Sequence, residues 1–192
     1  EFFNDLKERV GHIHSSNLYC IIAGDLVQSG NVNKPYDDFY DAFIKKLRVY
    51  VPLDHIYVTP GNHDLNRNLL KEDKWKKKHD NLIEWNNTET AFNETVKDAD
   101  SVIRKKFQSF NDFCTKKLQV ENYDLFGYSV NLIPEISVFL LNSALLANGG
   151  LEGLPKDKGL LKVETSVLYH WAHNNEGRKK ILVMHHPIHH LT

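Results

Sequence analysis

The chain has 192 residues, of which 41% are hydrophobic and 26% are charged, values that fit a globular protein and exclude collagen, coiled coils and largely disordered chains. The 24 Lys and Arg residues nearly balance the 25 Asp and Glu residues, which argues against a surface that is basic throughout. This length predicts a single domain over 1–192. Because no signal-like or bilayer-spanning apolar segment occurs, we expect no membrane association and a cytoplasmic protein with two reduced cysteines.

The first part of the chain alternates between helical and strand patterns. An amphipathic helix is expected from Phe2 to Val10, with Gly11 at its end. The continuous apolar run Leu18–Ala23 is typical of a buried strand, and a second strand is expected at about His55–Thr59. Between them, apolar residues recur at helical spacing from Pro35 to Leu47, which predicts a helix.

The middle of the chain is the most polar. We expect a polar and helical insertion at about 65–120 that lies over one end of the core and includes a helix from about Ala99 to Leu118. Lysines are frequent from Lys71 to Lys78, a pattern typical of a solvated face. The alternative is a surface that binds a phosphodiester backbone, favoured by Trp75 and opposed by nearby acidic residues.

The last third again combines strands and a helix. Strands are expected at about Asp124–Asn131, Ile136–Leu141 and Lys180–Met184, with a helix at roughly Glu164–Asn174. This alternation indicates an α/β domain. In such domains ligands bind beyond the carboxyl ends of the strands, so the residues that follow each strand are the first candidates for a site.

Three of the expected strands end in polar, ligand-like segments. These segments are Gly24-Asp25, Gly61-Asn62-His63-Asp64 and His185-His186-Pro187. Each one alone is weak, since an Asp after a strand is commonly a turn or cap residue. Their occurrence together, in this order and each after an apolar strand, is far more specific. The eleven histidines, four of them between residues 185 and 190, also favour a metal or acid-base site.

In these three segments the chain resembles the calcineurin-like metallophosphoesterase superfamily, whose motifs run D-x-H, G-D, G-N-H-[DE], H and G-H-x-H. The surrounding residues, such as Leu141-Asn142-Ser143, resemble a bacterial intracellular branch. The resemblance implies an α/β fold in which a two-sheet β-sandwich is flanked by helices. The first and last motifs have no counterpart at the expected places, so we expect an incomplete domain from within a larger chain.

The resemblance also implies the roles of the site residues. Two divalent metal ions, with Mn favoured over Fe, Zn, Ni or Co, would be bridged by Asp25, and Asn62 and His185 would be ligands of the second ion. His63 would be catalytic and face the phosphate near the leaving oxygen. Asp64 is grouped with His63 as a catalytic residue that helps to fix the loop, with capping of a following helix as the alternative.

Two residues depart from the protein-phosphatase branch of the superfamily. Gln28 stands where that branch has a carboxylate that pairs with the catalytic histidine, and Asp64 replaces its glutamate. We therefore expect a metal-dependent hydrolase acting by two-metal hydroxide attack on a phosphodiester, such as a nucleic acid or nucleotide, rather than on a monoester. The alternative is an incomplete, non-catalytic module that binds a phosphorylated ligand or a protein partner.

The other histidines are weaker candidates for a role in the site. Gly11-His12-Ile13-His14 spells the last family motif but precedes the first one, so a connecting loop is expected there and a circularly permuted site is the alternative. His186 is expected to support the site rather than to bind metal. His79 has no motif around it and is assigned no role.

Overall fold

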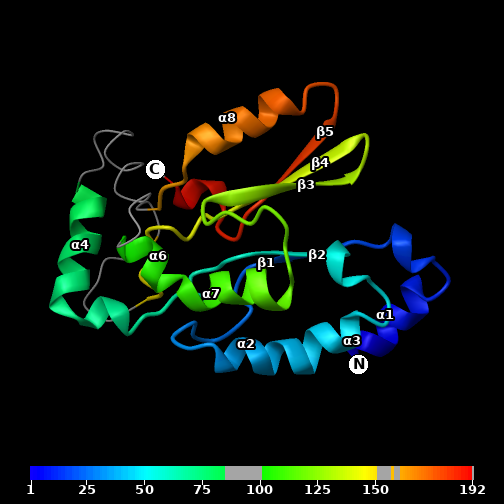
Figure 1. The fold of residues 1–192 in the computed structure, drawn as a ribbon, viewed down its shortest axis with the longest axis horizontal. Coiled ribbons are helices and arrows are strands. Elements are labelled where there is room, and N and C mark those ends of the chain that lie inside the picture. The colour runs from blue at the N-terminus through cyan, green and yellow to red at the C-terminus, as the bar shows by residue number, and fades with distance from the viewer. Residues whose placement is uncertain (85–100, 151–156, 158–160, 192) are drawn as a thin grey trace.

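The computed structural model describes residues 1–84, 101–150, 157 and 161–191, which form a mixed α/β protein with two small sheets (Figure 1). In the first sheet, β1 (Cys20–Ala23) and β2 (Ile56–Thr59) are parallel. The second sheet has the order β3 (Gly127–Ile133), β4 (Ile136–Leu141) and β5 (Lys179–Val183). β3 and β4 are antiparallel, whereas β4 and β5 are parallel. The predicted α/β class is therefore confirmed.

Side chains connect the two sheets at β2. The hydroxyl of Tyr128, on β3, accepts a hydrogen bond from the amide of Val58 at 3.1 Å and donates one to its carbonyl at 2.9 Å. Thr59 donates from Oγ1 to the carbonyl of Leu141, at the end of β4, at 2.8 Å. Among the described strands β2 pairs with β1 alone, so its other edge lacks a partner strand there, and Tyr128 satisfies the backbone groups of Val58.

A continuous helical segment packs against the first sheet. It consists of α2 (Lys34–Phe39), a π-helical turn over Tyr40–Ile44 and α3 (Lys45–Leu47), in agreement with the helix predicted from Pro35. α1 (Phe2–Val10) has the predicted bounds and contacts this segment through Phe2 and Phe3, both close to the ring of Phe43. Gly11 caps α1 in right-handed geometry and donates to the carbonyl of Lys7.

The helix predicted over Ala99–Leu118 is interrupted in the structure. Its described part consists of α6 (Val102–Lys106), α7 (Gln108–Asp112) and a π-helical turn over Phe113–Lys117, and the break is at Phe107. The stripe expected from the spacing is nonetheless buried; it comprises Ile103, Phe107, Phe110 and Cys114. These side chains belong to the main core, which also contains Tyr36, stacked on Phe113. Neither cysteine forms a disulfide, and Cys20 is only partly buried.

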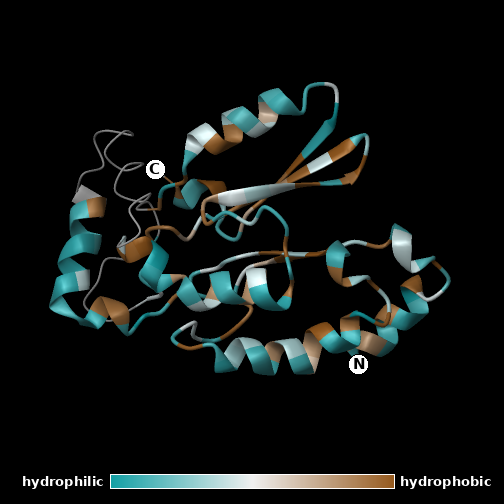
Figure 2. Cartoon of the chain, viewed as in Figure 1, coloured by the Kyte–Doolittle hydropathy of each residue, from teal (hydrophilic) through white to brown (hydrophobic). Residues whose placement is uncertain are grey.

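The polar segment contains a helix that the sequence did not predict. α4 (Asp73–Glu84) buries Trp75, His79 and Leu82, whereas its lysines are exposed. Most of the ribbon of α4 has the colour of hydrophilic residues in Figure 2. Three buried positions were too few among the charges to indicate a helix. Within the segment 65–120, residues 85–100 lie outside the described part of the chain.

The remaining elements agree closely with the prediction. β4 has the predicted bounds, β5 begins one residue early, and α8 (Thr165–Asn174) begins after Glu164, whose carboxylate caps it. A short 3-10 turn, Ile188–His190, follows β5. In the described residues, no helix is long and apolar enough to span a membrane.

Candidate active site at the carboxyl ends of the strands

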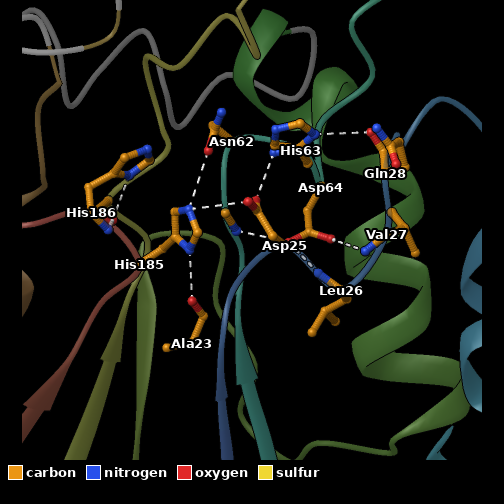
Figure 3. Close-up of polar contacts among 12 residues, drawn as sticks. Ala23, Asp25, Leu26, Val27, Gln28, Asn62, His63, Asp64, His185 and His186 are labelled. Carbon is orange, nitrogen blue, oxygen red and sulfur yellow. Dashed lines mark hydrogen bonds and ion pairs between the residues drawn. The ribbon is translucent and has the colours of Figure 1, made fainter.

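The loops that follow β1, β2 and β5 meet at one place (Figure 3). Gly24 (φ 90°) and Asp25 (φ 55°) both adopt left-handed backbone conformations directly after β1. A Cβ atom at Gly24 would lie 2.4 Å from Nδ1 of His185, and one at Gly61 would lie 2.2 Å from Oδ1 of Asp25. Only glycine allows this approach at both positions. The strained Asp25 is typical of a functional site, since such conformations cluster there.

His185 presents one ring nitrogen to the site. Its Nδ1 atom lies 2.8 Å from the carbonyl oxygen of Ala23, an acceptor, so Nδ1 carries the proton. The Nε2 atom is then an electron-pair donor and lies 3.2 Å from Oδ1 of Asn62 and 3.5 Å from Oδ2 of Asp25. Three groups that can each donate an electron pair to a cation thus face one another. Imidazole, amide and carboxylate together form a donor set that suits a divalent transition metal.

The described residues bring together donors for one cation. Asp25 directs Oδ2 toward His185, while its Oδ1 atom accepts a hydrogen bond from the amide of His63 at 3.0 Å. In the described part of the chain, no three His, Cys, Asp or Glu side chains gather in a metal-binding arrangement, because the third donor here is the amide of Asn62. Asp25, Asn62 and His185, the three predicted ligands, therefore lie together. Donors for a second cation, apart from Asp25, are not found among these residues.

His63 lies between the loops that follow β1 and β2. Its Nδ1 atom is 3.2 Å from the backbone carbonyl of Gln28 and also contacts Nη2 of Arg67. Position 28 therefore reaches the histidine through its backbone rather than through a carboxylate. Nδ1 can donate to the carbonyl or accept from the guanidinium, but not both at once. In either case these contacts are on the Nδ1 side of the ring, and Nε2 is left to face a ligand.

Asp64 is buried beneath the loops. Its side chain is fully buried and accepts hydrogen bonds from the amides of Gly61, Leu26 and Val27 at 2.9, 3.3 and 3.3 Å. The hydroxyl of Tyr36 donates to its backbone carbonyl at 2.8 Å. Burial raises the pKa of Asp64 to about 6, against the lowering effect of the backbone donors. The carboxylate thus joins the loops after β1 and β2, and no helix begins at this residue.

His186 faces the second sheet rather than the metal donors. Its backbone amide donates to Oγ of Ser143 at 3.1 Å, and its Nδ1 atom lies 3.0 Å from the same oxygen. Burial lowers the pKa of His186 to about 4, so the ring is neutral.

Two residues of the site, Ser143 and Arg67, were not among the predicted site residues. Ser143 follows β4 and Arg67 follows the second motif. Neither residue was given a role from the sequence, although Ser143 lies two residues after the end of β4.

His12 and His14 lie at the opposite end of β1 from Asp25. They occupy the loop between α1 and β1, and α1 is on the side of the structure where β2 begins (Figure 1). His14 caps the short turn Ser15–Asn17 and accepts a hydrogen bond from the amide of Ser16. This is the connecting loop that was expected, and the structure does not bring these histidines to the strand ends that carry Asp25 and Asn62.

Comparison with known proteins identifies the family. The family model described as calcineurin-like phosphoesterase matches residues 1–191. Searches of curated proteins and of solved structures gave no match.

Proposed function

Since the chain belongs to the calcineurin-like phosphoesterase family, we propose that it hydrolyses phosphodiesters with the help of divalent metal ions, of which Mn²⁺ is our first choice. Membership of this family implies phosphoester hydrolysis in general, and its members typically bind two metal ions. We also propose that the two sheets correspond to the β-sandwich of the family, with the site at the carboxyl ends of their strands.

The observation that carries the proposal is the convergence of three donor atoms. Nε2 of His185, Oδ1 of Asn62 and Oδ2 of Asp25 face one another with no hydrogen between them when His185 is neutral. Unpaired acceptors at such distances repel one another, and a cation between them removes the repulsion. Asp25, Asn62 and His185 would hold this ion. Divalent ions in such enzymes supply Lewis acidity toward phosphoryl oxygens and a hydroxide nucleophile.

We assign separate roles to two residues near these donors, His63 and Asp64. His63 binds the phosphate and protonates the leaving oxygen from Nε2, because Gln28 and Arg67 hold its Nδ1 side. Asp64 accepts hydrogen bonds from backbone amides of the loops that carry Asp25 and His63. It therefore holds these loops in position relative to each other and acts as a positioning residue. Its burial separates it from the phosphate.

A diester is the preferred substrate because features of the protein-phosphatase branch are missing. Gln28 contacts His63 through its backbone carbonyl, so position 28 supplies no carboxylate to this imidazole. Such a histidine protonates a leaving alkoxide or aryloxide. Among diesters, we propose a nucleic acid, or a nucleotide that contains a diester linkage, as the substrate.

A second candidate is a module that binds a phosphorylated ligand without hydrolysing it. The observation in its favour is that the described residues provide donors for only one of the two ions typical of the family. One phosphate could then bind between the cation and His63 and remain intact.

Hydrolysis of bis(p-nitrophenyl) phosphate and of p-nitrophenyl phosphate, each with Mn²⁺, separates these candidates. We expect the diester to be cleaved faster and Asp25→Asn to abolish cleavage. Cleavage of the diester by Asp25→Asn at the wild-type rate would refute the proposal. The second candidate would instead be established if the wild-type chain cleaves neither substrate but binds phosphate, and if this binding requires both Mn²⁺ and Asp25.

A further inference from the structure

We propose that the lysines of α4 and α6 form a surface that binds the phosphate backbone of a nucleic acid and directs it to the active site. This inference rests on the proposed function, because it names the class of phosphodiester. We call this region the lysine surface; it comprises Lys74, Lys76, Lys77, Lys78 and Lys105.

The lysine surface is organised around one indole ring. The ammonium groups of Lys74, Lys78 and Lys105 lie 4.8, 5.0 and 4.8 Å from the centroid of Trp75. An indole stabilises one cation well, but the ammonium groups of Lys74 and Lys78 on the same ring also repel one another. A phosphate group near these ammonium groups would relieve that repulsion. Trp75 itself is buried, so it supports the lysines and is not a platform for base stacking.

Lys74 and Lys78 differ from several lysines on the other helices. Lys34, Lys45 and Lys117 each form an ion pair with an aspartate, at 2.9, 2.8 and 2.8 Å. Within the described residues, no carboxylate forms such a pair with Lys74 or Lys78, and both are exposed. Between residues 71 and 80 there are five lysines and three carboxylates, so the segment is positive in a chain whose net charge is −1. A local excess of positive charge of this kind attracts polyanions.

One backbone hydrogen bond joins α6, which carries Lys105, to the segment that follows His63. The amide of Asn66, three residues after His63, donates to the carbonyl of Lys106 at the end of α6, at 2.6 Å. α4 and α6 both lie on the side of the structure toward which β2 runs (Figure 1), and Asn62 and His63 follow that strand. A phosphodiester chain with one phosphate at His63 could therefore extend onto these two helices.

Phosphate contacts of this kind predict binding that is independent of base sequence and sensitive to salt. The lysines supply point charges, and neither Trp75 nor another aromatic ring of α4 is exposed for base recognition. For single strands, each neutralised phosphate contributes about 0.7 to the slope of log affinity against log salt concentration. Removing Lys74 and Lys78 should lower that slope by at most about 1.4.

The test measures binding of fluorescein-labelled oligothymidylate by anisotropy at several KCl concentrations, with EDTA present so that hydrolysis plays no part. We expect Lys74→Ala/Lys78→Ala to bind more weakly at low salt and with the shallower slope. The control is Lys179→Ala/Lys180→Ala, which removes two exposed lysines of β5 and should bind as the wild type does. Both double variants should cleave bis(p-nitrophenyl) phosphate at the wild-type rate, because this small diester does not reach α4.

Equal affinity and equal slope for the wild-type chain and Lys74→Ala/Lys78→Ala would overturn the inference. The inference would also be overturned if polyglutamate, at the same concentration of charges, displaced the oligonucleotide. The surface would then bind an acidic polypeptide as well as it binds a nucleic acid. If no diester is cleaved but the lysine variant still binds DNA more weakly, the proposed function fails while the lysine surface stands.

Discussion

The carbonyl oxygen of Ala23 lies 2.8 Å from Nδ1 of His185, a residue 162 positions later in the chain. This hydrogen bond joins the end of β1 to the end of β5 and fixes the tautomer of His185. It leaves Nε2 facing Asn62 and Asp25. A metal ligand whose second ring nitrogen donates to a backbone carbonyl is a common arrangement, because the bond orients the ring.

Gly61→Ala should weaken metal binding without unfolding the protein. The new methyl group would lie 2.2 Å from Oδ1 of Asp25 and 2.6 Å from its amide, so the carboxylate must move. We expect Mn²⁺ affinity to fall by at least about 10-fold, comparable to the loss of a residue that orients a ligand. Gly177→Ala is the control. Its backbone is left-handed and its surroundings are open, so it should cost about 1–2 kcal/mol of stability and leave Mn²⁺ binding unchanged.

Asp64→Asn should lower the free energy of unfolding. An amide in place of the carboxylate directs N–H groups toward the amides of Gly61, Leu26 or Val27, so at least one buried donor loses its acceptor. The expected cost is about 1–3 kcal/mol, measured by urea denaturation. A variant as stable as the wild type would show that these bonds do not hold the loops together.

His63→Gln should reduce kcat for bis(p-nitrophenyl) phosphate by about 10²–10⁴-fold, since glutamine cannot transfer a proton to the leaving oxygen. Mn²⁺ affinity should stay the same, because only the backbone amide of His63 contacts Asp25. The matched control is His14→Gln, at the other end of β1, which should retain full activity. A large loss of Mn²⁺ binding in His63→Gln would instead identify this side chain as a ligand.

A buried pair on α4 and α6 should make a contribution to stability that rises with pH. Nζ of Lys106 lies 2.6 Å from the carbonyl of Ala147 and 3.3 Å from Nε2 of His79. Burial lowers the pKa of Lys106 from 10.5 to about 7 and that of His79 from 6.5 to about 3. At Lys106 the unfolded chain then binds more protons than the folded chain between pH 7 and 10.5, and at His79 it does so between pH 3 and 6.5. Each group therefore adds stability as the pH rises through its range.

Urea denaturation at pH 7 and pH 9 tests the contribution of Lys106. The free energy of unfolding of the wild type should increase over this interval, and that of Lys106→Met should increase less, because the variant lacks the titrating group. Parallel pH profiles for the two proteins would contradict the lowered pKa of Lys106.

Sequence patterns predicted the strands and the site better than the polar segment. Apolar runs and the polar residues after them are local features, so the bounds of β4 and the grouping of Asp25, Asn62 and His185 could be expected. The match of a family model over residues 1–191 confirms the family that those motifs resembled. The break at Phe107, where the backbone leaves helical geometry (φ −101°, ψ 12°), is not encoded in the spacing of apolar residues.

The buried polar residues could not be predicted. His79 and Lys106 are 27 positions apart and carry no motif, and only the packing of α4 on α6 brings them together. A lysine within a run of charges indicates an exposed side chain, yet Lys106 is fully buried. Likewise, the contact between Arg67 and His63 depends on the turn that separates them rather than on any helical spacing.

The most direct test of the site is a calorimetric titration of Mn²⁺ into the wild-type chain and into Asn62→Leu, with Asn68→Leu as the matched control on the exposed surface six residues away. We predict that the wild type and Asn68→Leu bind the ion with equal affinity. Asn62→Leu should bind it at least about 10-fold more weakly, because it lacks one of the three donors. Equal binding by all three proteins would contradict the assignment of Asp25, Asn62 and His185 as metal ligands.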